Sequence, residues 1–322
     1  MLRNIGAAVA IVLALVTGGA LAQEYPQRPI KLIVPFPPGG VTDIAARVVG
    51  QKMSDKWGQQ VVVENRSGAA GIVGVQVVQH AAPDGYTLLV TSGDFVAINP
   101  AAYAKLDYDA NKDFAPIAMI TNTPLVLVSS PKSGISNVKD LVAAAKAKPG
   151  ELGFSTPGNG STNHVTGELL AETLGIKLLH VPYRGGSPAA TAVASGEVPL
   201  GIVAISTAKP FVGAGSMKVV GIANPKRMAT VPDWQTLDEA GAPGFQAALW
   251  VGLWGPAGVA QPIVDMLHDE IGNILHQKEI QDRLATLGAQ PFEMTNAQFV
   301  AYIKSEADRF GKVVKQANIR IE

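Results

Sequence analysis

The stretch "VPFPPGGVTDIAARVVG", residues 34–50, decides the fold, because it joins an apolar run to an amphipathic one through a turn rich in proline and glycine. Residues 30–34 predict a short buried strand, and apolar side chains recur near helical spacing over 42–57. A strand, a tight turn and a helix in this order are typical of a βα unit in an α/β protein.

The turn is suited to holding an anion. It places the backbone N–H groups of Gly39, Gly40 and Val41 at the positive end of a helix dipole, where an anion binds without a charged side chain. The loop is stiffened by three prolines, Pro35, Pro37 and Pro38. The alternative is an ordinary βα turn in which Thr42 caps the helix and Asp43 stabilises its dipole.

A second stretch repeats the pattern. "FSTPGNGSTNHVTGE", residues 154–168, again predicts a strand, a glycine-rich turn and a helix, with Ser161, Thr162 and Asn163 near the helix start. Two such helix starts, about 120 residues apart, favour a cleft in which each domain holds one side of a small ligand. A third stretch, "NRSGAAGIVG" at 65–74, matches neither the dinucleotide fingerprint nor a P-loop.

Alternating strands and helices fill most of the chain, which predicts α/β architecture with a largely parallel sheet. Further strands are expected at 61–64, 87–90, 125–129, 152–155, 178–181, 200–203 and 219–223, and helices at 71–80, 136–147, 162–174 and 186–195. In the last third we expect a short helix in "TLDEAG", an apolar strand in "WVGLWGPAGVAQ", and helices at 261–287 and 296–316, the second capped by Thr295.

The N-terminus predicts export. Arg3, an apolar run over 5–16 and the small residues ending at Ala22 form a secretory signal peptide, so the mature chain is expected to begin at Gln23. The alternative is an uncleaved anchor. The chain has no cysteine, which excludes disulfides, a lipid anchor on cysteine and Cys-ligated zinc. We therefore expect a periplasmic protein of about 300 residues whose size favours two domains.

Charge and motifs exclude several classes of function. The full sequence has 26 basic and 26 acidic residues, and removal of the signal peptide takes away Arg3. The mature chain therefore carries 25 basic and 26 acidic residues, a balance that attracts neither nucleic acid nor an anionic membrane. There is no H-E-x-x-H or G-x-S-x-G motif, and the five histidines, at 80, 164, 180, 268 and 276, lack metal-ligand spacing. We expect no cofactor, no metal and no enzymatic activity.

A few side chains remain open in role. His164 either reaches a ligand or serves the local structure. Asp94, in "TSGDFVAINP", either pairs with an amine or is a solvated turn former. Tyr183, Trp250 and Trp254 either wall a pocket or, by default, pack in the core.

Taken together, the motifs resemble the periplasmic solute receptors of tripartite tricarboxylate transporters, the TctC or Bug receptor family. The proline-glycine loop and the Ser/Thr-glycine loop are the specific marks. The resemblance runs along essentially the whole mature chain, through "YPQRPIKLIVPFPPGGVTDIAARVV", "VVVENRSGAAGIVG", "AAPDGYTLLV", "INPAAYAKLDYDANKDFAPI", "ISNVKDLVAAAKAKPGELGFSTPGNGSTNHVTGELL", "VPYRGGSPAATAVASGEV" and "WVGLWGPAGVAQPIV".

The resemblance implies a two-lobed α/β binding protein of the Venus-flytrap, type II-like kind, each lobe a mixed or parallel sheet flanked by helices. It implies lobe 1 at 23–122 and 227–322, lobe 2 at 123–226, and a carboxylate held largely by backbone groups and ordered water. The expected ligand-binding residues are Pro38, Gly39, Gly40, Ser92, Asp94, Ser161, Thr162, Asn163, His164, Gly185 and Gly186. The expected partners are a small carboxylate or amino acid and the membrane transporter subunits, with the receptor a monomer.

Asp94 departs from the family pattern, in which small or hydroxyl residues are common at this loop. A carboxylate there repels a second ligand carboxylate, so we expect a monocarboxylate, or an amino acid whose ammonium pairs with Asp94. A sensor that signals through a membrane kinase, or an enzyme on the same fold, remains an alternative. Lobe closure predicts hinges near 120–124 and 224–230, as exposed connections.

Overall fold

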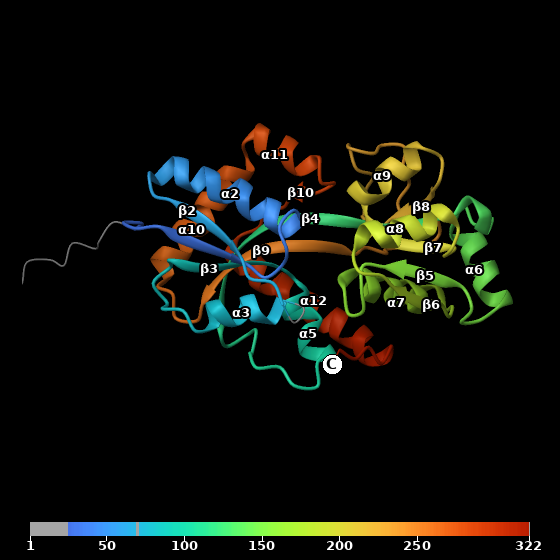
Figure 1. Ribbon diagram of the computed structural model, residues 1–322, viewed down its shortest axis with the longest axis horizontal. Helices are drawn as coiled ribbons and strands as arrows, with labels where there is room; N and C mark the ends of the chain where they lie inside the picture. The colour runs from blue at the N-terminus through green and yellow to red at the C-terminus, as the bar shows by residue number, and fades with distance from the viewer. Residues whose placement is uncertain (1–24, 69–70, 322) are drawn as a thin grey trace, which may run out of the picture.

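The computed structural model describes residues 25–68 and 71–321, so the predicted signal peptide and its cleavage after Ala22 lie outside the described residues. Ten strands form one connected sheet in the order β2-β1-β3-β9-β4-β7-β5-β6, and β8 and β10 also pair with β4. Helices cover both faces of this sheet, and the molecule is elongated with a lobe at each end (Figure 1). The expected two-lobed α/β fold is confirmed.

Lobe 1 is built from both ends of the chain. Its elements are β1 (Ile30–Val34), α2 (Val41–Trp57), β2 (Val61–Asn65), α3 (Ile72–Gln79), β3 (Thr87–Ser92), α4 (Asp94–Ala97), α5 (Asn99–Ala102), β9 (Ala248–Pro256), α10 (Gln261–Leu275), α11 (Lys278–Ala285), β10 (Gln290–Pro291) and α12 (Asn296–Gln316). One apolar cluster lies under α2 and α10, and a second lies under α3, α4 and α12. As predicted, Thr295 caps α12, in a capping box with Gln298.

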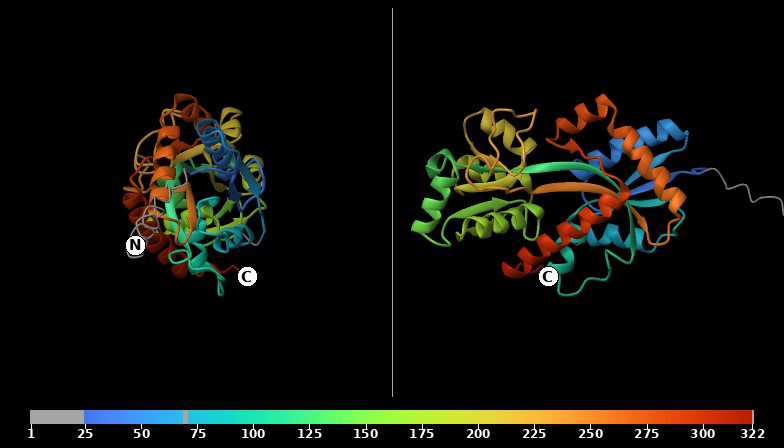
Figure 2. Two further views of the ribbon diagram at one scale, coloured as in Figure 1. Left: turned by 90° about the vertical axis from the view of Figure 1, so that its left-hand side faces the viewer. Right: turned by 180° about the vertical axis from the view of Figure 1, so that it is seen from behind.

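Lobe 2 is built from the middle of the chain. Its elements are the 3-10 turn at Pro131–Ser133, α6 (Val138–Ala147), β5 (Gly153–Thr156), α7 (Thr162–Leu174), β6 (Leu179–Pro182), α8 (Gly186–Ser195), β7 (Leu200–Ala204), α9 (Ile205–Gly213) and β8 (Lys218–Ile222). The β-strands are covered by α6 and α7 on one face and by α8 and α9 on the other (Figures 1 and 2).

One long strand, β4 (Phe114–Ser129), passes through both lobes. Its first part, as far as Pro124, pairs antiparallel with β9, and its last part, from Leu125, pairs antiparallel with β7 and β8. The predicted hinge at 120–124 is therefore not an exposed connection. Thr121 and Thr123 are fully buried in the middle of this strand.

The chain returns to lobe 1 at the start of β9. Between β8 and β9, Leu237 and Phe245 belong to the apolar cluster under α6 and α7, while Met228 and Val231 belong to the cluster under α8 and α9. The lobe limits expected from the resemblance assign 227–247 to lobe 1. This packing favours lobe 2 instead, and we propose that lobe 2 ends at residue 247.

The strand directions bring particular loops to the junction of the lobes. β1, β2 and β3 are mutually parallel, as are β5, β6 and β7. Because β3 is antiparallel to β9, β9 to β4, and β4 to β7, the two parallel sets run in opposite directions along the molecule. The carboxyl ends of both sets thus meet at the junction, where ligands bind in open α/β sheets.

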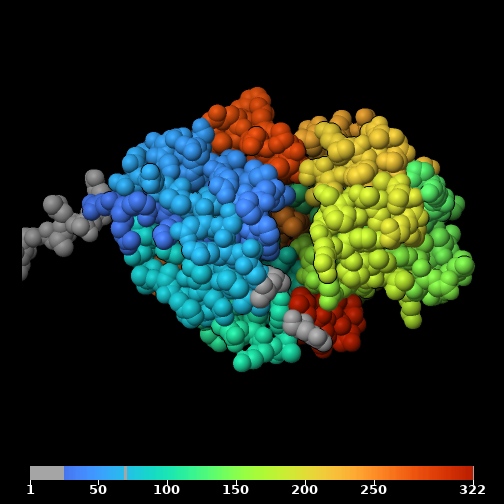
Figure 3. Space-filling model, in the orientation of Figure 1, coloured from blue at the N-terminus to red at the C-terminus, as the bar shows by residue number. Residues whose placement is uncertain are grey.

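A groove opens at this junction. The space-filling view shows it between the blue part of lobe 1 and the yellow part of lobe 2, with orange atoms of the β9 region at its floor (Figure 3). The helices that follow the inward-pointing strands begin at its walls. We call this feature the interlobe groove.

Several local predictions were wrong. "TLDEAG" forms consecutive turns in place of a helix, the helix expected at 261–287 is divided into α10 and α11, and the short helices α4, α5 and α9 were not expected. The strand expected at 125–129 begins earlier, at Phe114, because its pairing with β9 overrides two prolines, Pro116 beside a bulge and Pro124 at the last pair of the β4–β9 ladder. These differences leave the βα order of the predicted loops unchanged.

Candidate functional site

Helix N-termini without a side-chain cap face each other across the interlobe groove. In lobe 1, α2 begins after Gly40, whose extended backbone (φ −78°) forms the N-cap with no side chain bonded to the first turn. In lobe 2, α8 begins after Gly185 and α9 after Ala204, and neither has a side-chain cap. Each end therefore presents free N–H groups and a partial positive charge toward the groove.

The N-cap of α2 is Gly40, so the alternative in which Thr42 caps the helix is wrong. The loop before it is held by Asp43, which is 2% exposed and accepts a hydrogen bond from the Gly39 N–H at 2.9 Å. The Gly39 N–H is thus already used. Within the described residues no partner is found for the N–H groups of Gly40 and Val41, which leaves these two for a ligand.

Asp43 is the buried centre of a hydrogen-bond network. It accepts hydrogen bonds from Arg47 Nε (3.1 Å) and Asn65 Nδ2 (2.8 Å), and Asn65 also donates to the Phe36 carbonyl (3.0 Å). Burial acts to raise the pKa of Asp43, but the hydrogen bonds from Arg47, Gly39 and Asn65 outweigh it and hold the pKa below 3.8. The charged carboxylate therefore fixes the loop from behind and leaves its outer face, with Pro37 and Pro38, exposed.

The start of α7 differs from that of α2, because its polar side chains are used within the protein. Ser161 caps α7 by accepting from the His164 N–H, and Asn163 Nδ2 donates to the Ile202 carbonyl at 2.9 Å. The Thr162 hydroxyl donates to the carboxylate of Asp94, which lies in lobe 1. The Ser/Thr-glycine loop is thus tied both to lobe 2 and across the groove.

Asp94 follows a glycine, Gly93, that packs tightly against Trp250. Gly93 donates from its N–H to the Trp250 carbonyl (3.0 Å), and a Cβ on Gly93 would lie 2.1 Å from the Trp250 ring, so only glycine fits. Burial raises the pKa of Asp94, while the hydroxyls of Thr162 and Ser92 act against this rise. The Ser92 hydroxyl is buried and makes no hydrogen bond of normal geometry with the described residues.

His164 lies beneath the loop. Its ring stacks on His180 with centroids 3.5 Å apart, its Nδ1 accepts from the Gly160 N–H at 3.2 Å, and Glu168 lies 3.7 Å from its Nε2. His180 Nε2 in turn contacts the Thr156 hydroxyl at 2.6 Å. Desolvation and the neighbouring His164 lower the pKa of His180 to about 3. The contacts of His164 are those of a local structural role.

Two hydroxyl residues that the sequence reasoning missed lie at the same wall. Ser206 and Thr207 occupy the first turn of α9, and a Cβ on Gly186 would lie 3.6 Å from the Thr207 hydroxyl. Both are partly exposed. The signal for them was present, because "AISTAKP" after a strand repeats the strand, Ser/Thr and helix pattern that identified Ser161.

The three aromatic residues are accounted for by packing and hydrogen bonding. Trp250 and Trp254 are buried with Phe299 in the second apolar cluster of lobe 1, which confirms the alternative in which they pack in the core. The Tyr183 hydroxyl donates to Glu197 at 2.8 Å. None of these contacts requires a ligand.

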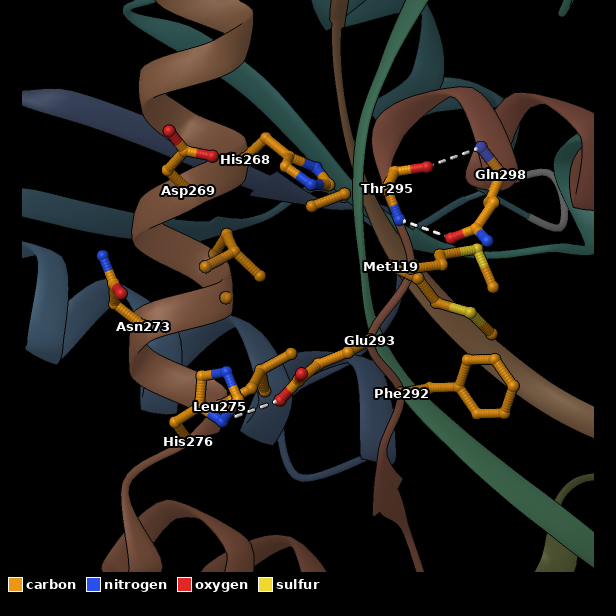
Figure 4. Close-up of a pocket in the computed structure, with 14 residues that line it drawn as sticks. Met119, His268, Asp269, Asn273, Leu275, His276, Phe292, Glu293, Thr295 and Gln298 are labelled. Carbon is orange, nitrogen blue, oxygen red and sulfur yellow. Dashed lines mark hydrogen bonds and ion pairs between the residues drawn. The ribbon is translucent and has the colours of Figure 1, made fainter.

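A separate pocket of about 570 Å³ lies between α10, β10 and the start of α12, away from the helix ends of the groove (Figure 4). Its polar groups are largely paired: His276 with Glu293 (3.2 Å), Thr295 with Gln298, and His268 Nδ1 with the Ile117 carbonyl (2.9 Å). No predicted site residue lines it.

Within residues 25–68 and 71–321, no group of three or more His, Cys, Asp or Glu side chains is placed to hold a metal ion. Over the same residues, no helix has the length and apolar character needed to cross a membrane.

Two lobes joined by continuous strands, with anion-ready helix ends facing across a groove, define a solute-binding protein of the two-lobed class. The chain belongs to the tripartite tricarboxylate transporter family of receptors, whose sequence profile matches residues 45–319. It is 34% identical over 302 residues to the protein BugT of Bordetella pertussis, covering 94% of this chain and 93% of that one. The resemblance predicted from the sequence is confirmed.

Solved structures agree with this assignment. Rpa4515 of R. palustris, solved with adipate, superposes with a TM-score of 0.81 at 31% identity, covering 92% of this chain and 99% of that one. MatC (Rpa3494) of Rhodopseudomonas palustris, solved with bound malate, superposes with a TM-score of 0.77 at 32% identity, covering 90% and 100%.

Proposed function

We propose that this receptor captures a small carboxylate in the interlobe groove and delivers it to a tripartite membrane transporter. The observation that carries the proposal is the set of uncapped helix N-termini, α2 in lobe 1 and α8 and α9 in lobe 2, at the carboxyl ends of inward-pointing strands. These ends bind carboxylates through backbone N–H groups and the helix dipole.

We propose the following division of the site. In lobe 1, Pro38, Gly39 and Gly40 form the loop against which one carboxylate lies. In lobe 2, Gly185 and Gly186 form the opposite wall together with Ser206 and Thr207, whose place in the first turn of α9 supports this role. The remaining predicted residues, Ser92, Asp94, Ser161, Thr162, Asn163 and His164, shape the side of the groove.

The relatives solved with adipate and with malate favour a carboxylate as the ligand class. Both are dicarboxylates, which two facing helix ends suit. The prediction from Asp94 is different, since it favours a monocarboxylate or an amino acid. Which subclass binds is therefore the first question for the experiment.

The setting of the receptor belongs to the same proposal. We propose that residues 1–22 are a signal peptide, that the mature protein is a periplasmic monomer, and that it has no enzymatic activity. Membership in a receptor family supports the periplasmic setting and a binding role in place of an enzymatic one. A pull-down with the membrane subunits of the transporter would separate transport from signalling through a membrane kinase.

A thermal-shift panel on residues 23–322, refolded from denaturant to remove carried-over ligand, tests the function. The panel contains adipate, malate, monocarboxylates, amino acids and the matching neutral amides. A ligand at 100 times its Kd stabilises by about 2.7 kcal/mol, which raises Tm by several degrees. If amides raise Tm as much as acids, or no acid raises it, carboxylate capture is wrong.

A further inference from the structure

Few polar contacts join the lobes beside the groove, and one of them is part-buried, between a buried threonine and a partly exposed aspartate. The Thr162 hydroxyl, on the first residue of α7, donates to the carboxylate of Asp94, on the first residue of α4. Thr162 is 4% exposed. At the rim of the molecule, Asn159 Nδ2 also donates to the Arg320 carbonyl, at 2.9 Å, but this contact is exposed.

Both groups stand on rigid elements of their own lobe. On the side of lobe 1, Gly93 is pressed against Trp250, so the loop that carries Asp94 has no room to withdraw. On the side of lobe 2, the neighbouring Asn163 is bonded to the Ile202 carbonyl of β7. Because neither side chain can follow the other lobe outward, the contact exists only while the lobes are together.

The contact also gives the Asp94 carboxylate a protein partner. A carboxylate buried without a cation is costly unless it accepts hydrogen bonds. The Thr162 hydroxyl supplies one, and the buried Ser92 hydroxyl lies on the same wall. A ligand ammonium is therefore not required to explain this partly buried acid.

We propose that Asp94 and Thr162 form a latch that stabilises the closed receptor, so that they set the balance between open and closed forms for every ligand alike. This inference rests on the proposed function only in that closure serves ligand capture. A hydrogen bond of this charged kind shifts a closed-to-open ratio by roughly tenfold. The apparent affinity of any ligand held by the closed form follows the closed fraction, and it shifts by the same factor while that fraction is small.

The chain suits a direct measurement of closure, because it has no native cysteine. Spin labels on Lys56→Cys and Lys209→Cys, two exposed positions on α2 and α9, report the distance between the lobes by electron–electron double resonance. Thr162→Val removes the donor, while Thr162→Ser keeps it. Thr173→Val makes the same substitution at an exposed site at the other end of α7 and serves as the matched control.

The latch predicts that Thr162→Val shifts ligand-free protein toward long distances, with a closed-to-open ratio lowered roughly tenfold. Thr162→Ser and Thr173→Val should overlay the wild type. Asp94→Asn keeps an oxygen acceptor for Thr162 but removes its charge, so its closed-to-open ratio should lie between those of the wild type and Thr162→Val. A distance distribution that Thr162→Val leaves unchanged overturns the latch.

A second arm separates the latch from ammonium recognition by Asp94. L-aspartate and succinate differ by an ammonium group, and their affinities are measured for wild type, Asp94→Asn and Thr162→Val. The latch predicts that Thr162→Val weakens both probes by a similar factor and that Asp94→Asn leaves their ratio unchanged. If Asp94→Asn lowers the affinity for aspartate relative to succinate, while Thr162→Val leaves both affinities unchanged, the latch is overturned. The distance measurement needs no ligand, so its result is independent of the thermal-shift panel.

Discussion

The two glycine-rich loops of the interlobe groove follow the same strand, turn and helix pattern but end in different ways. The loop before α2 has glycine at its N-cap and leaves the helix end open, while the loop before α7 has Ser161 bonded to the first turn. The polar side chains behind them also differ: Asp43 holds the first loop from inside lobe 1, whereas Thr162 reaches Asp94 in the other lobe. A shared pattern thus left an uncapped helix end in one lobe and a hydrogen bond between the lobes in the other.

This difference implies that the counterpart of α2 in lobe 2 is not α7. The helix ends of lobe 2 that remain open are those of α8 and α9, which lie beside each other, since a Cβ on Gly186 would nearly touch Thr207. We therefore propose that α2, α8 and α9 capture the ligand and that α7 serves closure. The variants below change either the helix ends proposed to capture the ligand or the loop before α7.

The largest effect is expected from Gly40→Asp. Nothing lies within 4 Å of a Cβ at this position and the backbone is extended, so the side chain fits and caps α2. Its charge occupies the place of the ligand carboxylate, and affinity should fall by at least about 100-fold, while the free energy of unfolding stays equal or rises by about 0.5 kcal/mol. Isothermal titration and urea unfolding measure the two quantities.

Three companion variants sharpen this test. Gly40→Asn supplies a cap without a charge and should lose less affinity than Gly40→Asp. Ala204→Asp, at the N-cap of α9, should also weaken binding, whereas Ser161→Asn keeps α7 capped and should change Kd by less than about threefold. Equal losses at Ser161 and Gly40 would contradict the division between the two loops.

The next effect concerns the group that fixes the first loop. Asp43→Ala leaves Gly39, Arg47 and Asn65 without their buried acceptor and should destabilise the protein by about 2–3 kcal/mol at pH 7. The folded pKa of Asp43 lies below its unfolded value of 3.8. Its stabilisation is therefore fully present above that pH and is lost as pH falls through the folded pKa.

Urea unfolding of wild type and Asp43→Ala at pH 7 and near pH 3 measures this difference. The difference in free energy of unfolding between the two proteins should be smaller at the lower pH. A gap that is equal at both values would show that packing, and not the charged carboxylate, accounts for the loss.

A smaller effect is expected from the stacked histidines under the second loop. The pKa of His180 is about 3 in the folded protein against 6.5 when unperturbed, so its contribution to stability is complete above 6.5 and declines as pH falls toward 3. His180→Phe keeps a ring against His164 and removes the titration. When the pH is lowered from 7 to 4.5, the Tm of His180→Phe should fall by about 2–4 °C less than the Tm of the wild type. His80→Phe, which removes an exposed histidine, is the control.

Much of this fold was predictable from local chemistry. The bounds of α7 and α8 were predicted correctly, because a left-handed glycine, Gly175 or Gly196, ends each helix. The first half of β4 was missed, because Pro116 and Pro124 argue against a strand and only the pairing with β9 across 130 residues of chain overrides them. α9 was missed because Pro210 lies inside it.

The site was predictable in position but not in detail. The βα order placed both loops at one junction, since parallel strands end at a common edge. Whether an N-terminal hydroxyl or acid bonds to its own helix, to the neighbouring lobe or to a ligand depends on side-chain geometry. Asp43 and Thr162 follow similar turns at similar offsets, yet one bonds within its loop and the other across the groove.

The smallest effect is expected at Ser161, the N-cap residue of α7. Ser161→Ala removes the side-chain oxygen that accepts from the His164 N–H, and loss of such a cap costs about 1 kcal/mol of stability. Because the proposed role of α7 is closure and not carboxylate contact, Kd should change by less than about threefold. Chemical unfolding and titration on the same preparation measure both. A large loss of affinity at unchanged stability would mean that the Ser161 hydroxyl contacts the ligand directly, and α7 would then join α8 and α9 in the capturing wall.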